Sequence, residues 1–215
     1  MVAFKTEGII LKRKNYSESD RILTIFSKNR GKITVLAKGV RKITSRRAGN
    51  VELLNRVQIF LHQGKNFLIL TEATSIDTYP KIKEDLTLST YAYHIIELMD
   101  RLTAENQPNL DLYNDLVEVL NRLSDSPRQI LIRAFEVRIL SNLGFWSTEN
   151  IADLNKDISD ILKVLEKLGW EGISKLTISE KVALELERIL RYYIEKVLEG
   201  GLRSRQFLAK NKNER

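Results

Sequence analysis

The hydrophobic period of this sequence changes once, near residue 80. Before that point the apolar residues form short runs rich in β-branched side chains, and after it they recur at helical spacing. In the third run, Ile33 and Val35 alternate with Lys32 and Thr34, which is typical of a half-buried strand. The change predicts two domains, a β domain over residues 1–80 and a helical domain over residues 81–215. The predicted strands cover residues 4–11, 21–27, 32–37, 51–62 and 66–76.

Five short strands with no long helix between them favour a small closed barrel. Glycines in segments 29–31 and 63–65 mark tight turns between neighbouring strands. Closure removes the unpaired edges that so small a sheet would otherwise expose. We therefore expect an α+β chain of two domains, with a five-stranded barrel of the oligonucleotide-binding type followed by an all-α helical bundle.

The second part of the chain predicts five helices. Ser126 and Pro127 supply a capping side chain and a first-turn proline for the third helix, and Gly144 follows its end. The last helix begins at Ser179 and stops before the glycine pair at 200–201. The predicted helices cover residues 88–102, 112–123, 127–143, 156–168 and 179–199.

Positive charge is concentrated at the start of the chain. The first 50 residues hold 13 Lys and Arg against three acids, a balance of +10, whereas the remainder has a balance of −3. The stretch 37–50 contains Lys38, Arg41, Lys42, Arg46 and Arg47 and no acidic residue. This asymmetry indicates a basic binding module for a polyanion; the alternative is an idle loop whose charge serves only solubility.

Several classes of function lack the residues they need. The chain has no cysteine and only two histidines, His62 and His94, so we expect no disulfide and no metal site. No nucleophile, phosphate-binding or dinucleotide motif occurs, so we expect neither an enzyme nor a cofactor. Charged residues interrupt the first apolar stretch, and no apolar run is long enough to span a membrane. We expect a cytoplasmic protein without membrane partners.

The order of residues is more specific than their composition. Residues 8–46 combine an apolar strand, the turn Tyr16-Ser17-Glu18-Ser19-Asp20-Arg21, Gly31-Lys32, Ala37-Lys38-Gly39 and Ser45-Arg46. Two further landmarks follow along the chain, RAFEVRILSNLGF at 133–145 and LRSRQFL at 202–208. Together these landmarks resemble the bacterial recombination mediator family RecO. Many members of that family carry a four-cysteine zinc module after the second landmark; here residues 145–157 contain no cysteine, and we expect Phe145 and Trp146 to pack there instead.

The resemblance implies a DNA repair function without covalent chemistry. Members of this family bind single-stranded DNA, with double-stranded DNA as a further ligand, and anneal complementary strands. With RecR they help load RecA onto DNA covered by single-strand-binding protein, in the bacterial cytoplasm at the nucleoid. A basic barrel would hold phosphates without reading sequence. The implied DNA-binding residues are Arg13, Lys14, Arg21, Lys32, Lys38, Arg41, Lys42, Arg46 and Arg47. The implied residues for the acidic tail of single-strand-binding protein are Arg133, Arg128 and Arg138.

Three alternatives stay open at this point. Tyr16 and Phe67 either stack on bases or pack within the barrel. A barrel that binds RNA, on the ribosome or transfer RNA, would show the same charge and fold. A metal-dependent nuclease built on helical carboxylates is the enzymatic alternative.

Overall fold

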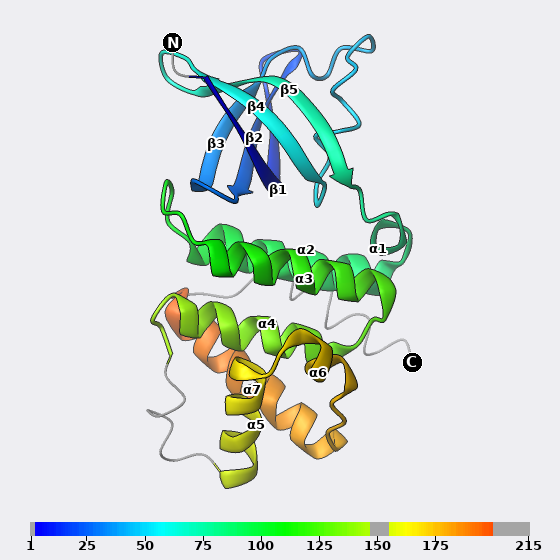
Figure 1. Cartoon of the computed structure of the whole chain (residues 1–215), viewed down its shortest axis with the longest axis vertical. Helices are drawn as coiled ribbons and strands as arrows, with labels where there is room; N and C mark the ends of the chain where they lie inside the picture. Colours follow the sequence, from blue (N-terminus) through cyan, green and yellow to red (C-terminus); the bar gives the residue numbers. More distant parts are fainter. Residues whose placement is uncertain (1–2, 147–154, 200–215) are drawn as a thin grey trace. The chain divides into compact units, whose positions relative to one another are not determined.

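The computed structural model describes residues 3–146 and 155–199, and it contains two compact units (Figure 1). The barrel unit comprises Met1–Pro80 and Leu98–Tyr113, and the helical unit comprises Lys81–Glu97 and Asn114–Arg215. The first boundary between the two units, after Pro80, lies where the hydrophobic period of the sequence changes. The barrel unit also takes in residues 98–113, which are separated from the strands in the sequence.

The barrel unit contains five strands that close into a barrel, as predicted. The order around the barrel is β1-β2-β3-β5-β4, with β3 and β5 parallel and the other pairs antiparallel. Buried aliphatic residues from all five strands, among them Ile10, Ile25 and Val57, form one core inside it. The strands are β1 (Ala3–Tyr16), β2 (Asp20–Ser27), β3 (Gly31–Ala37), β4 (Arg56–Gln63) and β5 (Leu68–Asp77).

Local backbone geometry explains the details that the pattern did not predict. Strand β4 begins at Arg56, not at residue 51, because Leu54 has a positive φ of 69° and the Asn55 side chain donates to the Gly49 and Asn50 carbonyls. Strand β1 is longer than predicted and contains a bulge between Ile10 and Lys12. A bulge bends a strand and increases its twist, which helps a five-stranded sheet to close.

Residues 98–113 are held to the barrel by polar contacts. The Lys32 ammonium donates to the Asp100 carbonyl at 2.5 Å, and the Asn106 amide donates to the Lys32 carbonyl at 2.8 Å. Gly31 has a φ of +64°, and a Cβ added there would lie 1.9 Å from the Gln107 carbonyl oxygen. Only glycine fits this position, because it combines left-handed backbone with close backbone approach.

Seven helices complete the described part of the chain. They are α1 (Pro80–Glu84), α2 (Leu86–Leu102), α3 (Leu110–Asp125), α4 (Gln129–Asn142), α5 (Lys156–Lys167), α6 (Trp170–Lys175) and α7 (Glu180–Val197). The helical region is confirmed, while the short helices α1 and α6 were not predicted. None of the described helices is both long and apolar enough to cross a membrane.

The predicted helix ends are right at two places and wrong at one. The Ser179 side chain accepts from the Val182 amide, and Gly144 has the positive φ that favours glycine after a helix. Helix α4, however, begins at Gln129 with Arg128 as its N-cap residue, so Ser126 and Pro127 lie before it. Because no side chain caps this end, the capping interpretation of Ser126 was wrong.

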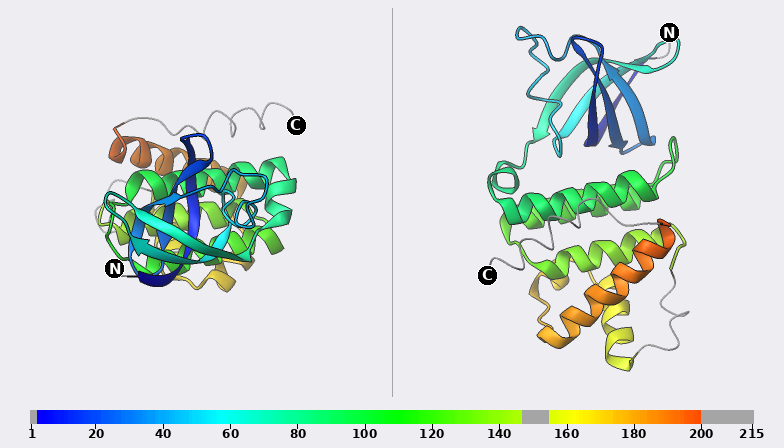
Figure 2. Two further views of the ribbon diagram at one scale, coloured as in Figure 1. Left: turned by 90° about the horizontal axis from the view of Figure 1, so that it is seen from above. Right: turned by 180° about the vertical axis from the view of Figure 1, so that it is seen from behind.

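Helix α4 is the centre of the helical unit (Figure 2). It contacts α5, α6 and α7, and nine of its 14 residues are buried. A helix that is covered on several sides has apolar residues around most of its circumference. Any polar side chain on such a helix must therefore find a partner inside the unit.

Candidate nucleic-acid interface

The basic stretch 37–50, called here the basic loop, packs along the edge of β5. Strands β3 and β5 pair only at Val35–Leu68 and Leu36–Ile69, so the following β5 carbonyls receive no bond from β3. The loop supplies those bonds instead. Arg47 donates to the Leu70 carbonyl at 2.7 Å, and Asn50 donates to the Ala73 carbonyl at 2.9 Å. The loop thus donates to β5 carbonyls beyond the two residue pairs that join β5 to β3.

The start of the basic loop is fixed to the β1–β2 turn. The Gly39 amide donates to the Asp20 carboxylate at 2.7 Å, and the Arg41 amide donates to the Ser19 carbonyl at 2.9 Å. The Arg41 guanidinium also donates to the Glu18 carbonyl at 3.0 Å. The ring of Tyr16, the last residue of β1, and that of Phe67, in the β4–β5 loop, meet edge to face at a centroid distance of 6.3 Å. Three loops therefore meet at one end of the barrel, where barrels of this type bind oligonucleotides.

Four of the predicted DNA-binding residues are exposed and unpaired. In the ranges that the structure describes, their side chains make no ion pair and no hydrogen bond. Three of them belong to the basic loop, and the fourth lies near the end of β1. This set, called here the free cations, consists of Lys14, Lys38, Lys42 and Arg46. Such side chains are available to phosphates without first breaking an internal contact.

Three other predicted residues do not join this set. Arg13 and Arg21 both contact the carboxylate of Glu52, the latter at 3.2 Å. Lys32 is buried, and its ammonium is bound to the Asp100 carbonyl. We therefore leave these residues out of the proposed surface. Glu52 stands two residues beyond the acid-free stretch, and only the folded loop brings its carboxylate to the two arginines.

Arg41 and Arg47 share properties of both groups, because each carries a charge on the basic loop and also binds backbone carbonyls. Arg41 is exposed, but its guanidinium also bridges the basic loop to the β1–β2 turn. Arg47 donates to the carbonyls of Leu70, Thr71 and Lys38. Replacing these two residues would therefore disturb the loop as well as remove charge, so the free cations are the cleaner target for mutation.

The neighbours Arg46 and Arg47 should differ sharply in their effect on stability. We expect Arg47→Ala to lower the free energy of unfolding by about 1–3 kcal/mol, because it removes the hydrogen bonds to the carbonyls of Leu70, Thr71 and Lys38 that hold the loop in place. Arg46→Ala should change it by less than about 0.5 kcal/mol, as is usual for an exposed, unpaired side chain. Urea unfolding of both variants, which lose the same charge, gives the comparison. Equal stabilities would contradict the anchoring role of Arg47.

Arg133 contacts a buried carboxylate in the helical unit. Its guanidinium donates to Glu136 at 2.5 Å, and the other oxygen of Glu136 lies 2.6 Å from His94 Nε2. Glu136 is 1% exposed. Burial acts to raise the pKa of Glu136, but the charge of Arg133 and the hydrogen bond from His94 outweigh it, so the pKa lies below its usual value. Arg133 itself is partly exposed, with 15% of its side chain accessible.

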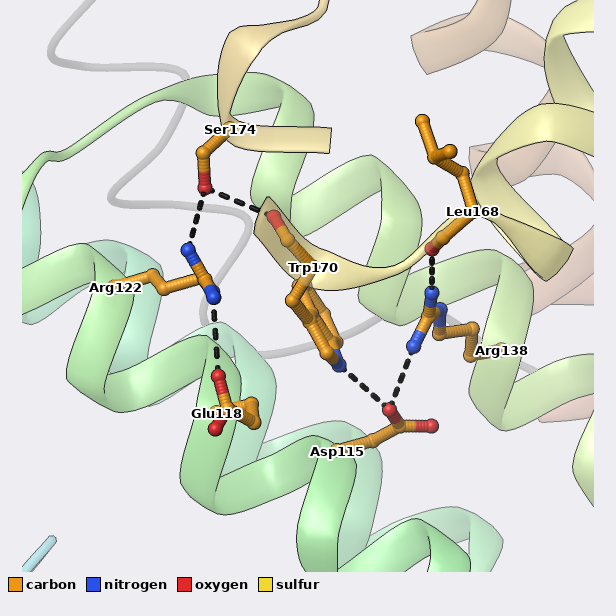
Figure 3. A network of polar contacts seen from close by, with 7 residues as sticks. All are labelled: Asp115, Glu118, Arg122, Arg138, Leu168, Trp170 and Ser174. Atoms are coloured by element: carbon orange, nitrogen blue, oxygen red, sulfur yellow. Dashed lines mark hydrogen bonds and ion pairs between the residues drawn. The ribbon is translucent and has the colours of Figure 1, made fainter. Parts of the chain in front are cut away.

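Arg138 and Arg128 close the carboxyl ends of two helices. Arg138 donates to the Leu165 carbonyl near the end of α5. Figure 3 shows its bonds to the Leu168 carbonyl and, at 2.8 Å, to Asp115. Its guanidinium lies 4.5 Å from the centroid of the Trp170 ring. Arg128 donates to the Ser174 carbonyl and, at 2.8 Å, to the Leu176 carbonyl after α6. Such carbonyls have no partner within their own helix. Only Arg133 therefore stays in the proposed tail-binding site.

The same network holds the short helix α6 in place. Trp170 Nε1 donates to Asp115 at 2.7 Å, and Arg122 links Glu118 to the Ser174 hydroxyl (Figure 3). Trp146 contacts the Tyr193 ring at 4.9 Å, whereas Phe145 is exposed, so only one of this aromatic pair packs as expected. Residues 147–154 and the landmark 202–208 lie outside the described residues.

Two carboxyl groups that are at least partly buried, Glu136 and Glu7, have lowered pKa values, and these predict a loss of stability in acid. Besides Glu136, burial acts to raise the pKa of Glu7, but hydrogen bonds from Tyr113 and Arg56 outweigh it and lower the pKa. A lowered pKa in the folded state stabilises the fold above the ordinary glutamate value of 4.5, and this contribution disappears as the pH falls below it. Urea unfolding at about pH 6 and about pH 3.5 should show the loss. An unchanged free energy of unfolding would contradict it.

Two family models match the chain. "Recombination protein O N terminal" matches residues 1–79, and "Recombination protein O C terminal" matches residues 83–146. A DNA repair protein RecO from Pelotomaculum thermopropionicum is 29% identical, with 97% of this chain and 94% of that protein covered. One from Acetivibrio thermocellus is 39% identical over 66% of this chain and 57% of that protein. One from Heliobacterium modesticaldum is 32% identical over 81% of this chain and 62% of that protein.

Proposed function

The chain belongs to the RecO family of DNA repair proteins, and from this premise we propose that it binds single-stranded DNA and anneals complementary strands during recombination. The observation that carries the proposal is the group of free cations, three on the anchored basic loop and one near the end of β1, at one end of the barrel. Family membership supports the repair role, and the loop supports the binding step.

The binding step is electrostatic in this proposal. Each free cation contacts a phosphate and releases a condensed counterion, which favours binding without reading sequence. Tyr16 is 46% exposed beside Phe67, so its ring offers a face for a base next to the cations. Annealing needs no nucleophile, because the protein only has to reduce the repulsion between two strands until their bases pair.

Three protein partners complete the proposal. Together with RecR, the chain would help to load RecA onto DNA covered by single-strand-binding protein. The acidic tail of that protein would bind at Arg133, next to the exposed Gln129 and the half-buried Tyr91, which are joined by a 2.8 Å hydrogen bond. Arg133 is kept in this role because no backbone carbonyl occupies it in the described residues, and because its contact with Glu136 leaves 15% of its side chain accessible to the tail.

Replacing Arg133 should weaken tail binding and spare DNA binding. We expect Arg133→Ala to raise the dissociation constant for an acidic tail peptide at least tenfold, which corresponds to about 1.5–3 kcal/mol for one charge-assisted contact. Arg133→Lys keeps a positive charge near Glu136 and should lie between this variant and the unchanged protein. Titrations against a labelled peptide and a labelled oligonucleotide measure both effects. Normal peptide binding by both variants would place the tail elsewhere.

An annealing assay tests the function itself. Complementary labelled oligonucleotides should pair faster with the protein than without it, and DNA should be preferred to RNA of the same sequence. Preference for RNA, with no acceleration of DNA annealing, would favour the ribosome- or transfer-RNA-binding alternative. Cleavage on adding magnesium or manganese ions would instead indicate a nuclease.

A further inference from the structure

A second basic site lies at the other end of β2 and β3 from the basic loop. An open hollow of about 420 Å³ is lined by the start of β1, the β2–β3 turn and the segment after α2. Its lining includes two cations and no carboxylate. This site, called here the Phe4–Arg30 hollow, is lined by Phe4, Lys5, Thr6, Asn29, Arg30, Asn106 and Pro108.

Hydrogen bonds fix the walls of the hollow relative to one another. The Lys28 amide donates to the Glu7 carbonyl at 2.8 Å, which ties the β2–β3 turn to β1. The Arg30 amide donates to the Ser27 hydroxyl at 3.2 Å, which shapes the turn itself. On the third side the Asn106 amide is bound to the Lys32 carbonyl. The hollow is therefore formed before any ligand binds, which lowers the cost of ordering on binding.

The two cations of the hollow are exposed, and neither makes an ion pair within the described residues. The Arg30 guanidinium lies 3.9 Å from the centroid of the Phe4 ring, so the ring orients the side chain and covers part of it. Bases stack on arginine planes, and a phosphate is bound by lysine and arginine together. Asn29 and Asn106 add neutral hydrogen-bonding groups beside them. Arg30 offers a plane for a base and Lys5 a charge for a phosphate. The pair therefore suits a nucleotide better than a ligand that carries only a carboxylate.

We propose that the Phe4–Arg30 hollow binds a second nucleic-acid strand while the basic loop holds the first. This inference rests on the proposed function, because annealing joins two strands. Strand β2 has eight residues, so the two sites lie roughly 25 Å apart along it. One molecule can therefore hold both strands without competition for the same side chains. Holding them together raises the effective concentration of each for the other.

Two non-complementary oligonucleotides, one with a donor and one with an acceptor fluorophore, test the proposal. Energy transfer reports both strands on one protein molecule, and a large excess of protein should abolish it by separating them. We expect Lys5→Ala/Arg30→Ala to raise the dissociation constant of the second strand at least tenfold and to leave that of the first within about twofold. The matched control, Lys156→Ala/Lys167→Ala, removes two exposed lysines of α5 and should behave like the unchanged protein.

Each outcome separates this inference from the proposed function. If the unchanged protein binds one strand and shows no energy transfer, the second site is wrong and the proposed function stands. If it binds no strand at all, the proposed function fails first. If Lys5→Ala/Arg30→Ala binds both strands normally but loses a protein partner such as RecR, the hollow is a protein-docking site and the inference is overturned.

Discussion

Replacing Lys38, Lys42 and Arg46 together with alanine should weaken single-stranded DNA binding about a hundredfold at about 0.1 M salt. Each phosphate contact contributes about 0.7 to the slope of log affinity against log salt, so three lost contacts should reduce the slope by about 2. Stability should change little, because these side chains make no contact that anchors the basic loop. Titrations of a labelled oligonucleotide over a range of salt concentrations measure both quantities.

A control of equal charge makes this result specific. The triple variant Lys156→Ala/Lys163→Ala/Lys167→Ala removes three exposed lysines from α5 and should retain most of the affinity. If both triple variants lose affinity equally, net charge alone governs binding. If the loop variant keeps full affinity and slope, the basic loop is idle and the proposed binding surface is wrong.

Removing the carboxylate of Glu136 should have the largest effect on stability. We expect Glu136→Ala to lower the free energy of unfolding by about 3–5 kcal/mol, because it leaves Arg133 and His94 near the centre of the helical unit without their shared partner. Glu118→Ala is the control, since it removes an exposed i,i+4 partner of Arg122 and should cost less than about 1 kcal/mol. Urea unfolding followed by the helical circular dichroism signal gives both values.

The intermediate variant Glu136→Gln checks the reason for the effect. An amide can still accept a hydrogen bond but carries no charge to balance Arg133, so its stability should fall between Glu136→Ala and the unchanged protein. If Glu136→Ala is as stable as the Glu118→Ala control, the buried charges are compensated in another way. The interpretation of this cluster would then be wrong.

The sequence predicted the architecture because strand and helix periods depend on local residue patterns. It also placed glycine where the backbone requires it, at Gly31 and Gly144. Even Asp20 and Gly39, which belong to separate landmarks of the first part, prove to be hydrogen-bonded to each other. These features are either local or carried by a motif.

The candidate site was harder to predict because charge in a sequence does not show which charges are already paired. Arg46 and Arg47 are adjacent and identical in type, yet one is free and the other binds backbone carbonyls. This difference depends on the point at which the backbone pairing of β3 with β5 ends, which is a property of the folded barrel. Glu136 did leave a signal, since a lone acid inside the apolar stretch 130–140 had to find a buried partner.

The short β3–β5 pairing has a consequence for the motion of the barrel. Two residue pairs form the only backbone ladder between these strands, and side chains of the basic loop complete the closure. Side-chain bonds at the surface can break one at a time, whereas the longer ladders must break together. The barrel can therefore open locally between β3 and β5 without unfolding. Amide hydrogens of these two strands should exchange with solvent through opening events of low free energy. Because side chains of the basic loop complete the closure between β3 and β5, a bound DNA strand that makes the loop more rigid should also slow this exchange.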